Sequence, residues 1–244
     1  MTVDNLTYKP FGDRAILIEW PVKIDEKTLN DVLNFKKTIQ KNSIKVIVDI
    51  ISTYNSLTIF YLTTIEKIDS EILALKSIYD KQNSFKNEKK YLWKIPVCYD
   101  QKFGLDLEEI SQQKRLSISE IIDLHSSHIY TIYFIGFLPG FLYLGGLDKK
   151  LHFQRKSNPR LHVEKGAVGI GDKQTGVYPQ ESAGGWNIIG NSPIDFFDRK
   201  RENPCFAQAG DKVQFIPVDI KVHEEIGSLV AYKRYHIESE VLDA

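Results

Sequence analysis

The sequence predicts an α+β protein with two domains, because its residue pattern changes once along the chain. In roughly the first ninety of the 244 residues, β-type runs alternate with segments whose apolar residues recur at helical spacing. Over 130–235 the pattern becomes short β-type runs broken by glycine, proline, asparagine and aspartate, which is typical of a small barrel or sandwich. The polar stretch 81–90 separates the two patterns, so we expect domains at 1–90 and 91–244.

The first domain is predicted to contain strands at three places. The apolar run at 15–20, the β-branched run at 45–51 and the run at 57–62 each suit a buried or half-buried strand. With a helix after the first and the third, the order becomes strand, helix, strand, strand, helix. This order predicts a ferredoxin-like α+β layer. A further strand at 91–97 can pair with either domain.

Helix starts are indicated by residues that can satisfy the free amide groups of a first helical turn. Asp25 is the expected N-cap of the first helix, and Asp106 is that of a short helix in the second domain. Capping boxes, in which a hydroxyl and a carboxylate satisfy two amides reciprocally, are predicted for Thr63 with Glu66 and for Ser117 with Glu120.

Charge and composition argue against several classes of partner. The 32 basic and 32 acidic side chains cancel, and no basic stripe or polybasic tail indicates nucleic acid or a membrane surface. No run of ~18 apolar residues predicts a membrane span, and the first thirty residues do not resemble a signal peptide. Two cysteines, Cys98 and Cys205, are too few for a disulfide framework, so we expect a cytoplasmic protein.

Familiar nucleotide and metal motifs are incomplete. The glycine run at 166–171 approaches a phosphate-binding loop, but Asp172 precedes the lysine and Gln174 stands where Ser or Thr is required. His125 and His128 are three residues apart, yet no third ligand is indicated. We therefore expect no metal, and the alternative for each histidine is a hydrogen-bonded structural role.

Two segments, 130–147 and 157–190, combine glycine, proline and aromatic residues at unusual density. Aromatic residues on rigid turns can form the walls of a small-ligand cleft or a partner surface. They can equally be the core of a tightly turned barrel, and composition leaves both interpretations open.

Arg155 and Arg160 are five residues apart in QRKSNPR, beside these segments. Guanidinium groups suit carboxylate or phosphoryl oxygens. The alternative is that they pin loops by pairing with Asp148, Glu164 or Glu181.

Several motifs occur together in one order across roughly residues 8–217: FGDRAILIE, IPVCYD with FGLDLEEI, YTIYFIGFLPGFLYLGGL, GAVGIG, QTGVYPQES, GGWNIIG and AGDKVQF. On these motifs the chain resembles the family variously called kinase-inhibitor-like, allophanate hydrolase subunit 1, or the 5-oxoprolinase B subunit. The resemblance implies a ferredoxin-like N-terminal domain followed by a cyclophilin-like β-barrel. Prolines common in the family are replaced here by Gln154, Glu164, Leu142 and Ala183, which relaxes the loops that carry them.

The resemblance also implies a function as part of a complex. The complex would couple ATP hydrolysis to the opening of 5-oxo-L-proline to L-glutamate. Its other members would be a homologous barrel protein (the C subunit) and a lactam-opening protein (the A subunit). This chain would be inactive alone, and the site of ATP in the complex is left open. Two alternatives remain: a regulatory module that inhibits a sensor histidine kinase, and a component of a complex acting on allophanate or urea-type substrates.

The candidate site residues come from the glycine-rich and aromatic segments and their neighbours. We expect His125 to act as general base or orienting group and Arg155 and Arg160 to clamp an oxyanion or phosphoryl group. The expected substrate-binding residues are Phe137, Gln174, Tyr178, Gly184, Gly185 and Trp186.

Overall fold

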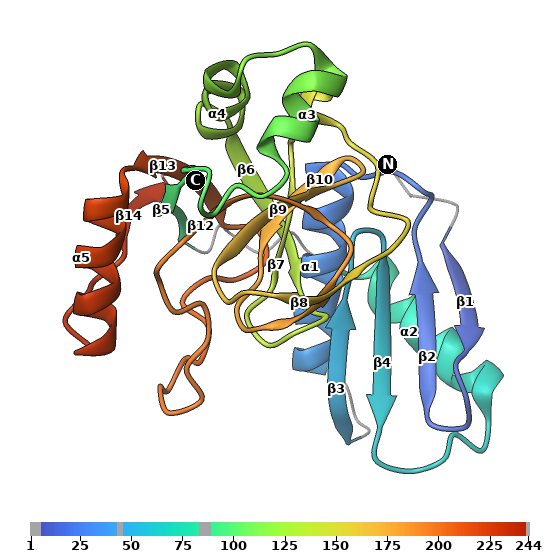
Figure 1. Ribbon diagram of the computed structural model, residues 1–244. Coiled ribbons are helices and arrows are strands. Elements are labelled where there is room, and N and C mark those ends of the chain that lie inside the picture. The colour runs from blue at the N-terminus through green and yellow to red at the C-terminus, as the bar shows by residue number, and fades with distance from the viewer. Residues whose placement is uncertain (1–5, 43–45, 83–88, 243–244) are drawn as a thin grey trace. The chain divides into compact units, whose positions relative to one another are not determined.

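The computed structural model describes residues 6–42, 46–82 and 89–242. The chain divides into two compact units, Met1–Glu88 and Lys89–Ala244, and each is described by itself (Figure 1).

The first unit is a four-stranded antiparallel sheet in the order β1-β2-β4-β3 with two helices on one face (Figure 1). Its elements are β1 (Thr7–Pro10), β2 (Ala15–Glu19), α1 (Glu26–Asn42), β3 (Ile47–Ser52), β4 (Ser56–Tyr61) and α2 (Ile68–Asp80). Alternate residues of β2 and β4 are buried, as the period of a half-buried strand requires. They form one core with Val32, Phe35 and Ile39 of α1 and Leu75 of α2.

The predicted order of strands and helices is present, with one strand more. The fourth strand of the sheet is β1, which precedes β2, whereas the strand predicted at 91–97 lies in the second unit as β5 (Lys90–Cys98). The ferredoxin-like assignment stays a prediction.

Asp25 caps α1 as expected, because its Oδ1 accepts a hydrogen bond of 2.7 Å from the amide of Thr28. The capping box predicted for Thr63 with Glu66 is wrong. Helix α2 begins at Ile68, and its N-cap residue makes no capping hydrogen bond with its side chain. The amide of Ile65 instead donates to the carbonyl of Asp13 at 2.9 Å, so tertiary contacts hold this segment outside the helix.

The second unit is a closed barrel of seven strands in the order β12-β9-β10-β7-β6-β13-β5, and the pairing of β12 with β5 closes it. The strands besides β5 are β6 (Ile129–Ile135), β7 (Leu142–Gly145), β9 (Ala167–Gly171), β10 (Gln174–Val177), β12 (Asn187–Asn191) and β13 (Lys212–Val218). Neighbours are antiparallel except β13 and β5, which run parallel. The structure therefore confirms a β-barrel after a mixed α/β segment, and the cyclophilin-like assignment stays a prediction.

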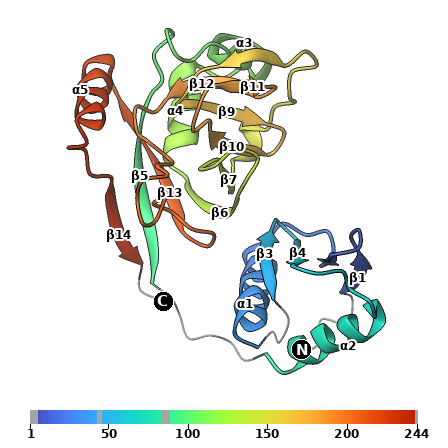
Figure 2. The ribbon, with the colours of Figure 1, turned by 90° about the horizontal axis from the view of Figure 1, so that it is seen from below.

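Further elements surround the barrel. The helices are α3 (Leu107–Lys114), α4 (Ile118–Ser126), α5 (Ile220–Ala231) and a 3-10 turn, η1 (Lys149–Leu151); β8 (Arg160–Val163) and β11 (Ser182–Gly184) form a two-stranded sheet. Strand β14 (Glu238–Leu242) extends the sheet beyond β5, and Figure 2 shows it with α5 outside the ring. The predicted capping box of Ser117 with Glu120 is confirmed at the start of α4.

Asp211, in the motif AGDKVQF, ties together two strands of the barrel. Its buried carboxylate accepts hydrogen bonds from the amides of Tyr91 (3.0 Å) and Gln208 (3.0 Å) and from the Trp93 indole (2.9 Å). The side chain thereby joins the start of β5 to the start of β13, the parallel pair of the barrel.

Among the described residues, none of the helices combines the length and apolar character that crossing a membrane requires.

Candidate functional site

The aromatic residues of the two dense segments converge on one cluster in the second unit. The Trp186 ring meets Phe141 edge to face at 5.4 Å, and Phe141 meets Tyr178 in the same way at 5.3 Å. All three side chains are buried, as a core interpretation requires, but they form a cluster separate from the one that fills the barrel. The backbone of Trp186 hydrogen-bonds the Tyr178 phenol, while burial raises the pKa of that phenol. A role for Tyr178 and Trp186 in binding stays a prediction.

Two neighbouring glycines serve this cluster differently. A Cβ atom at Gly184 would lie 2.3 Å from the Tyr178 hydroxyl oxygen, so this glycine makes room for the tyrosine. At Gly185 a Cβ would meet nothing closer than 3.6 Å. The Gly185 carbonyl accepts a hydrogen bond of 2.8 Å from the Lys156 amide, which holds the segment that carries both candidate arginines against the cluster.

Arg155 is exposed and lies over the Trp186 ring, with its guanidinium carbon 5.8 Å from the ring centroid. Within the described part of the chain it forms no ion pair with Asp148, Glu164, Glu181 or any other acid. Its charge also acts on the phenols of Tyr143 and Tyr178, whose pKa values burial raises and the arginine lowers. The guanidinium therefore has its hydrogen-bond donors open to an anion from solvent.

Arg160 has a different environment, since both arms of its guanidinium are bonded to Asp106. Nη1 donates to Oδ2 at 2.9 Å and Nη2 to Oδ1 at 2.7 Å. Lys156 contacts the same carboxylate at 2.8 Å, and the amide of Ile188 donates to Oδ2 at 2.6 Å. Arg160 thus fixes a loop, as one interpretation held, but its partner is Asp106 and not one of the three acids considered.

Asp106 precedes α3 without capping it through its side chain. The carboxylate faces β12 instead, and the Asp106 amide donates to the Ile188 carbonyl at 2.8 Å. Burial opposes ionisation of Asp106, but the bonds from Arg160 and Lys156 outweigh it and hold the pKa below its ordinary value. A buried, ionised carboxylate with two cationic partners therefore joins α3, β8 and β12.

A small recess of about 120 Å³ adjoins this ion cluster. Arg160 and Lys102 line it on the polar side, and Ala167 and Ile188 on the apolar side. Ligand pockets usually measure about 300–1,000 Å³, so this recess suits only a small group of a larger ligand.

The hydrogen-bond partners of His125 are Tyr99 and Thr175, and neither arginine is among them. Its Nδ1 is 2.7 Å from the Tyr99 hydroxyl and its Nε2 is 2.8 Å from Thr175 Oγ1. Because the Thr175 hydroxyl donates to the Gly169 carbonyl at 3.0 Å, it must accept from Nε2–H, and Nδ1 must accept from Tyr99. The ring also stacks on Phe215 at 4.6 Å.

Complete burial lowers the pKa of His125 to about 3. The imidazole is therefore neutral, and both its nitrogens have partners. This is the hydrogen-bonded structural histidine that was the alternative to a chemical role, and the geometry gives the general-base hypothesis no support.

The last two candidates lie in turns or at strand ends. Phe137 is 66% exposed, has a positive φ of 67°, and touches Phe141 edge to face at 5.8 Å. Gln174 is half-buried at the start of β10, opposite Gly171. The structure thus gathers Phe137, Arg155, Tyr178, Gly184, Gly185 and Trp186 around one aromatic cluster, and Arg160 borders it through its pairing with Gly184.

Sequence reasoning did not identify Asp106 and Lys156 as site residues. Lys156 stands between the two arginines in QRKSNPR, and Asp106 lies in FGLDLEEI, where it was interpreted only as a cap. Among the described residues, no group of three or more His, Cys, Asp or Glu side chains is placed to hold a metal ion.

Comparison with known proteins gives a consistent picture. The B subunit of 5-oxoprolinase from Bacillus subtilis (strain 168) is 34% identical over 86% of this chain and 92% of its own length. The protein of the same name from Escherichia coli O157:H7 is 37% identical over 70% of this chain and 78% of its own length.

Two solved structures are similar in fold. TTHA0988 superposes with a TM-score of 0.74 at 28% identity over 84% of this chain, which spans 40% of the length of that protein. The Kluyveromyces lactis urea amidolyase superposes with a TM-score of 0.83 at 19% identity over 99% of this chain and 17% of its own length, which shows the fold alone.

The family described as "Carboxyltransferase domain, subdomain C and D" matches residues 6–207. Since this match covers most of the chain, and two relatives named as B subunits of 5-oxoprolinase align with it over more than three quarters of their length, the family that the sequence motifs indicated is confirmed: the chain belongs to the carboxyltransferase subdomain C and D family.

Proposed function

We propose that this chain is one subunit of an ATP-dependent 5-oxoprolinase complex, which opens 5-oxo-L-proline to L-glutamate, and that it is inactive without its partner subunits. The single observation that carries the proposal is the 34% identity to the B subunit of a 5-oxoprolinase over 92% of that protein. The proposed partners are a homologous barrel protein (the C subunit) and a lactam-opening protein (the A subunit).

ATP is proposed as the cofactor of the complex, and its site is left open, except that the glycine run 166–171 of this chain does not fit a phosphate loop. Residues 167–171 form strand β9, are buried, and pair with β10 and β12. Their amides therefore lie in a sheet instead of an open cradle that could receive phosphate oxygens. The following turn presents Asp172, whose charge opposes an anion.

Within this chain, Arg155 is the residue best placed to receive an anionic or carbonyl oxygen of the substrate. Its side chain is exposed, it has no acid partner among the residues described, and the Trp186 ring beneath it limits its directions. Arg160, in contrast, acts as a positioning residue, because Asp106 occupies both arms of its guanidinium. We assign Phe137 to contact with substrate or with a partner, since it is exposed at the end of the same cluster.

The test is reconstitution of the complex. The chain is co-expressed with its candidate partner subunits, and 5-oxoproline-dependent ADP release is followed together with glutamate formation. Both products should appear only when every subunit is present. Full turnover without this chain would overturn the proposal. A stable complex that turns over allophanate or urea, but not 5-oxoproline, would favour the substrate class suggested by the urea amidolyases.

A second candidate function is favoured by one observation. Phe137 holds a large apolar side chain in solvent on a backbone conformation that non-glycine residues rarely adopt. Such a residue suits contact with another protein, as a module regulating a sensor histidine kinase requires. Inhibition of kinase autophosphorylation by the purified chain, lost in Phe137→Ser, would support this function; unchanged autophosphorylation would exclude it for the kinase tested.

A further inference from the structure

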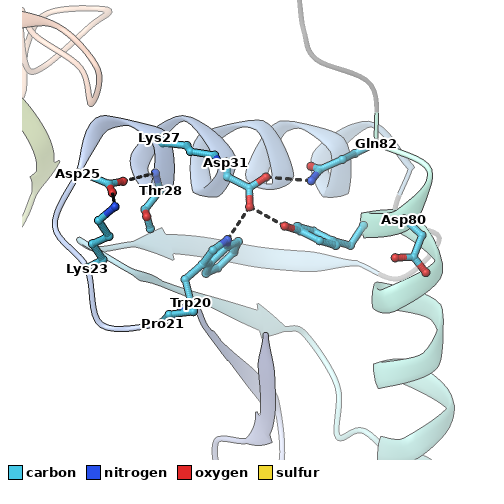
Figure 3. Close-up of a pocket in the computed structure, with 10 residues that line it drawn as sticks. Trp20, Pro21, Lys23, Asp25, Lys27, Thr28, Asp31, Asp80 and Gln82 are labelled. Atoms are coloured by element: carbon cyan, nitrogen blue, oxygen red, sulfur yellow. Dashed lines mark hydrogen bonds and ion pairs between the residues drawn. The ribbon is translucent and has the colours of Figure 1, made fainter. Parts of the chain in front are cut away.

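A cavity of about 610 Å³ lies in the first unit, whose residues the proposed function does not use. It is bordered by the segment between β2 and α1, by the first turns of α1 and by the C-terminal end of α2 (Figure 3). Its volume falls within the range of about 300–1,000 Å³ that is usual for small-molecule sites.

Asp31 lines this cavity and accepts hydrogen bonds from three other residues that line it. Its Oδ2 accepts hydrogen bonds from the Trp20 indole at 2.7 Å and the Tyr79 hydroxyl at 2.5 Å, and its Oδ1 accepts one from Gln82 at 3.1 Å (Figure 3). One donor follows β2 and two lie at the C-terminal end of α2, and all three are uncharged, so they fix the position of the carboxylate without neutralising it. The Oδ1 atom, with a single bond, keeps capacity for a further donor.

The charges around the cavity do not balance. Three carboxylates line it, those of Asp25, Asp31 and Asp80, against two lysines, Lys23 and Lys27. Lys23 pairs with Asp25 at 2.7 Å, and Asp25 also caps α1. Within the described ranges, no lysine or arginine pairs with Asp31 or Asp80.

The charges of Asp31 and Asp80 also act on the phenol of Tyr8. Burial first, and then the charges of Asp80 and Asp31, raise the pKa of Tyr8 to about 12. The negative charges of Asp31 and Asp80 therefore act beyond the residues that line the cavity.

A buried acceptor adds to this excess. Gln82 donates its amide nitrogen to Asp31, which fixes the orientation of the amide, and its Oε1 has no hydrogen-bond donor among the described residues. A buried carbonyl oxygen without a donor is unfavourable, because it has lost its hydrogen bonds to water without replacing them. A ligand group with several N–H donors would give Gln82 Oε1 the donor it lacks and Asp31 Oδ1 a second one.

We propose that this cavity binds a small organic cation that carries a primary ammonium or guanidinium group. The charged group donates to Asp31 Oδ1 and Gln82 Oε1, and Asp80 contributes to its attraction from the rim. The rings of Trp20 and Tyr79 supply the apolar contact that an organic ligand requires. We expect weaker binding of an inorganic cation, because the described residues contain no cluster of three metal-ligating side chains here.

The experiment titrates the full-length chain with two probes of matched ring and opposite charge, phenethylamine and phenylacetate, by isothermal calorimetry. Saturable binding of phenethylamine is expected, with phenylacetate weaker by about tenfold or more. Equal affinity for the two probes, or no phenethylamine binding at millimolar concentration, would overturn the proposal.

Replacements of the two aspartates test whether phenethylamine binds in this cavity. Asp31→Asn should weaken phenethylamine binding about tenfold or more, and Asp80→Asn should weaken it several-fold. Asp80 is exposed, so Asp80→Asn remains informative if Asp31→Asn loses its fold by circular dichroism. Asp69→Asn, at the other end of α2, is the matched control and should leave affinity unchanged. Binding that is insensitive to both Asp31→Asn and Asp80→Asn would place the cation elsewhere and refute the assignment.

Discussion

Asp106 and Arg160, 54 residues apart in sequence, form a two-armed ion pair that joins the start of α3 to strand β8. Asp106 is almost fully buried, with 3% of its side chain exposed, whereas Arg160 retains 27%. The pair therefore combines a desolvated carboxylate with a cation at the edge of solvent, beside the cluster that carries Arg155.

Asp106→Ala should lower the free energy of unfolding by about 3 kcal/mol, because it leaves Arg160, Lys156 and the Ile188 amide without their shared acceptor. Urea denaturation followed by circular dichroism measures the change. Glu109→Ala is the control: it removes a half-exposed partner of Lys156 and Gln113 and should lower the free energy by less than about 1 kcal/mol. Equal losses in the two variants would contradict a special role for Asp106.

Arg155→Ala should reduce kcat/KM of the reconstituted complex by about tenfold to a hundredfold, the effect of losing one charge-assisted hydrogen bond. Stability should change by less than about 1 kcal/mol, since the exposed side chain contributes only its contact with the Trp186 ring. Parallel assays of turnover and urea denaturation separate the two effects. Unchanged turnover would remove Arg155 from the site. The double replacement of Arg155 and Arg160 is less informative, because Arg160 also holds the fold.

His125 should make stability depend on pH. Its pKa is about 3 in the folded protein and about 6.5 when unfolded, so the unfolded chain binds a proton first as the pH falls. The contribution of His125 to the free energy of unfolding is fully present above about pH 6.5. It is lost as the pH falls towards 3, where the free energy of unfolding changes by nearly 1.4 kcal/mol per pH unit. Urea denaturation at several pH values measures the slope, and His125→Gln should reduce it. A wild-type slope retained in His125→Gln would assign the dependence to other groups.

Gly184 and Gly185 offer a matched pair of neighbours. Gly184→Ala places a methyl group 2.3 Å from the Tyr178 hydroxyl oxygen and should destabilise the protein by about 1–3 kcal/mol. Gly185→Ala has ordinary contacts of 3.6 Å and should change stability little. Thermal denaturation of the two variants compares them directly. A larger loss in Gly185→Ala than in Gly184→Ala would refute the packing argument.

Local patterns predicted the parts of the fold that local contacts determine. Asp25 caps α1, and Ser117 with Glu120 forms the predicted box, because partners three residues apart meet wherever a helix begins. Thr63 with Glu66 has the same spacing but no helix begins there, and the Ile65 amide between them bonds to the carbonyl of Asp13, which is distant in sequence.

The site was predicted less completely for the same reason. From the sequence, Arg160 was predicted as an anion clamp and Asp106 as a helix N-cap. No sequence pattern indicated that these two residues form an ion pair with each other. The burial of His125 could not be predicted from the sequence either. Histidine is a residue type that often acts as a base, but this one has the surroundings of a core residue. The family motifs located the aromatic cluster, and its contacts came only from the fold.

Strand β5 has a consequence for synthesis of the chain. It is the first strand of the barrel, yet its partners are β12, β13 and β14, the last three strands of the unit. Cys98 and Asn191, which meet where the ring closes, are 93 residues apart in sequence. During translation β5 therefore leaves the ribosome with both edges unpaired and waits until nearly the whole unit has been made. A chain stopped before β12 would present this apolar strand to other chains, so premature termination in the second unit should yield aggregates instead of a shortened barrel.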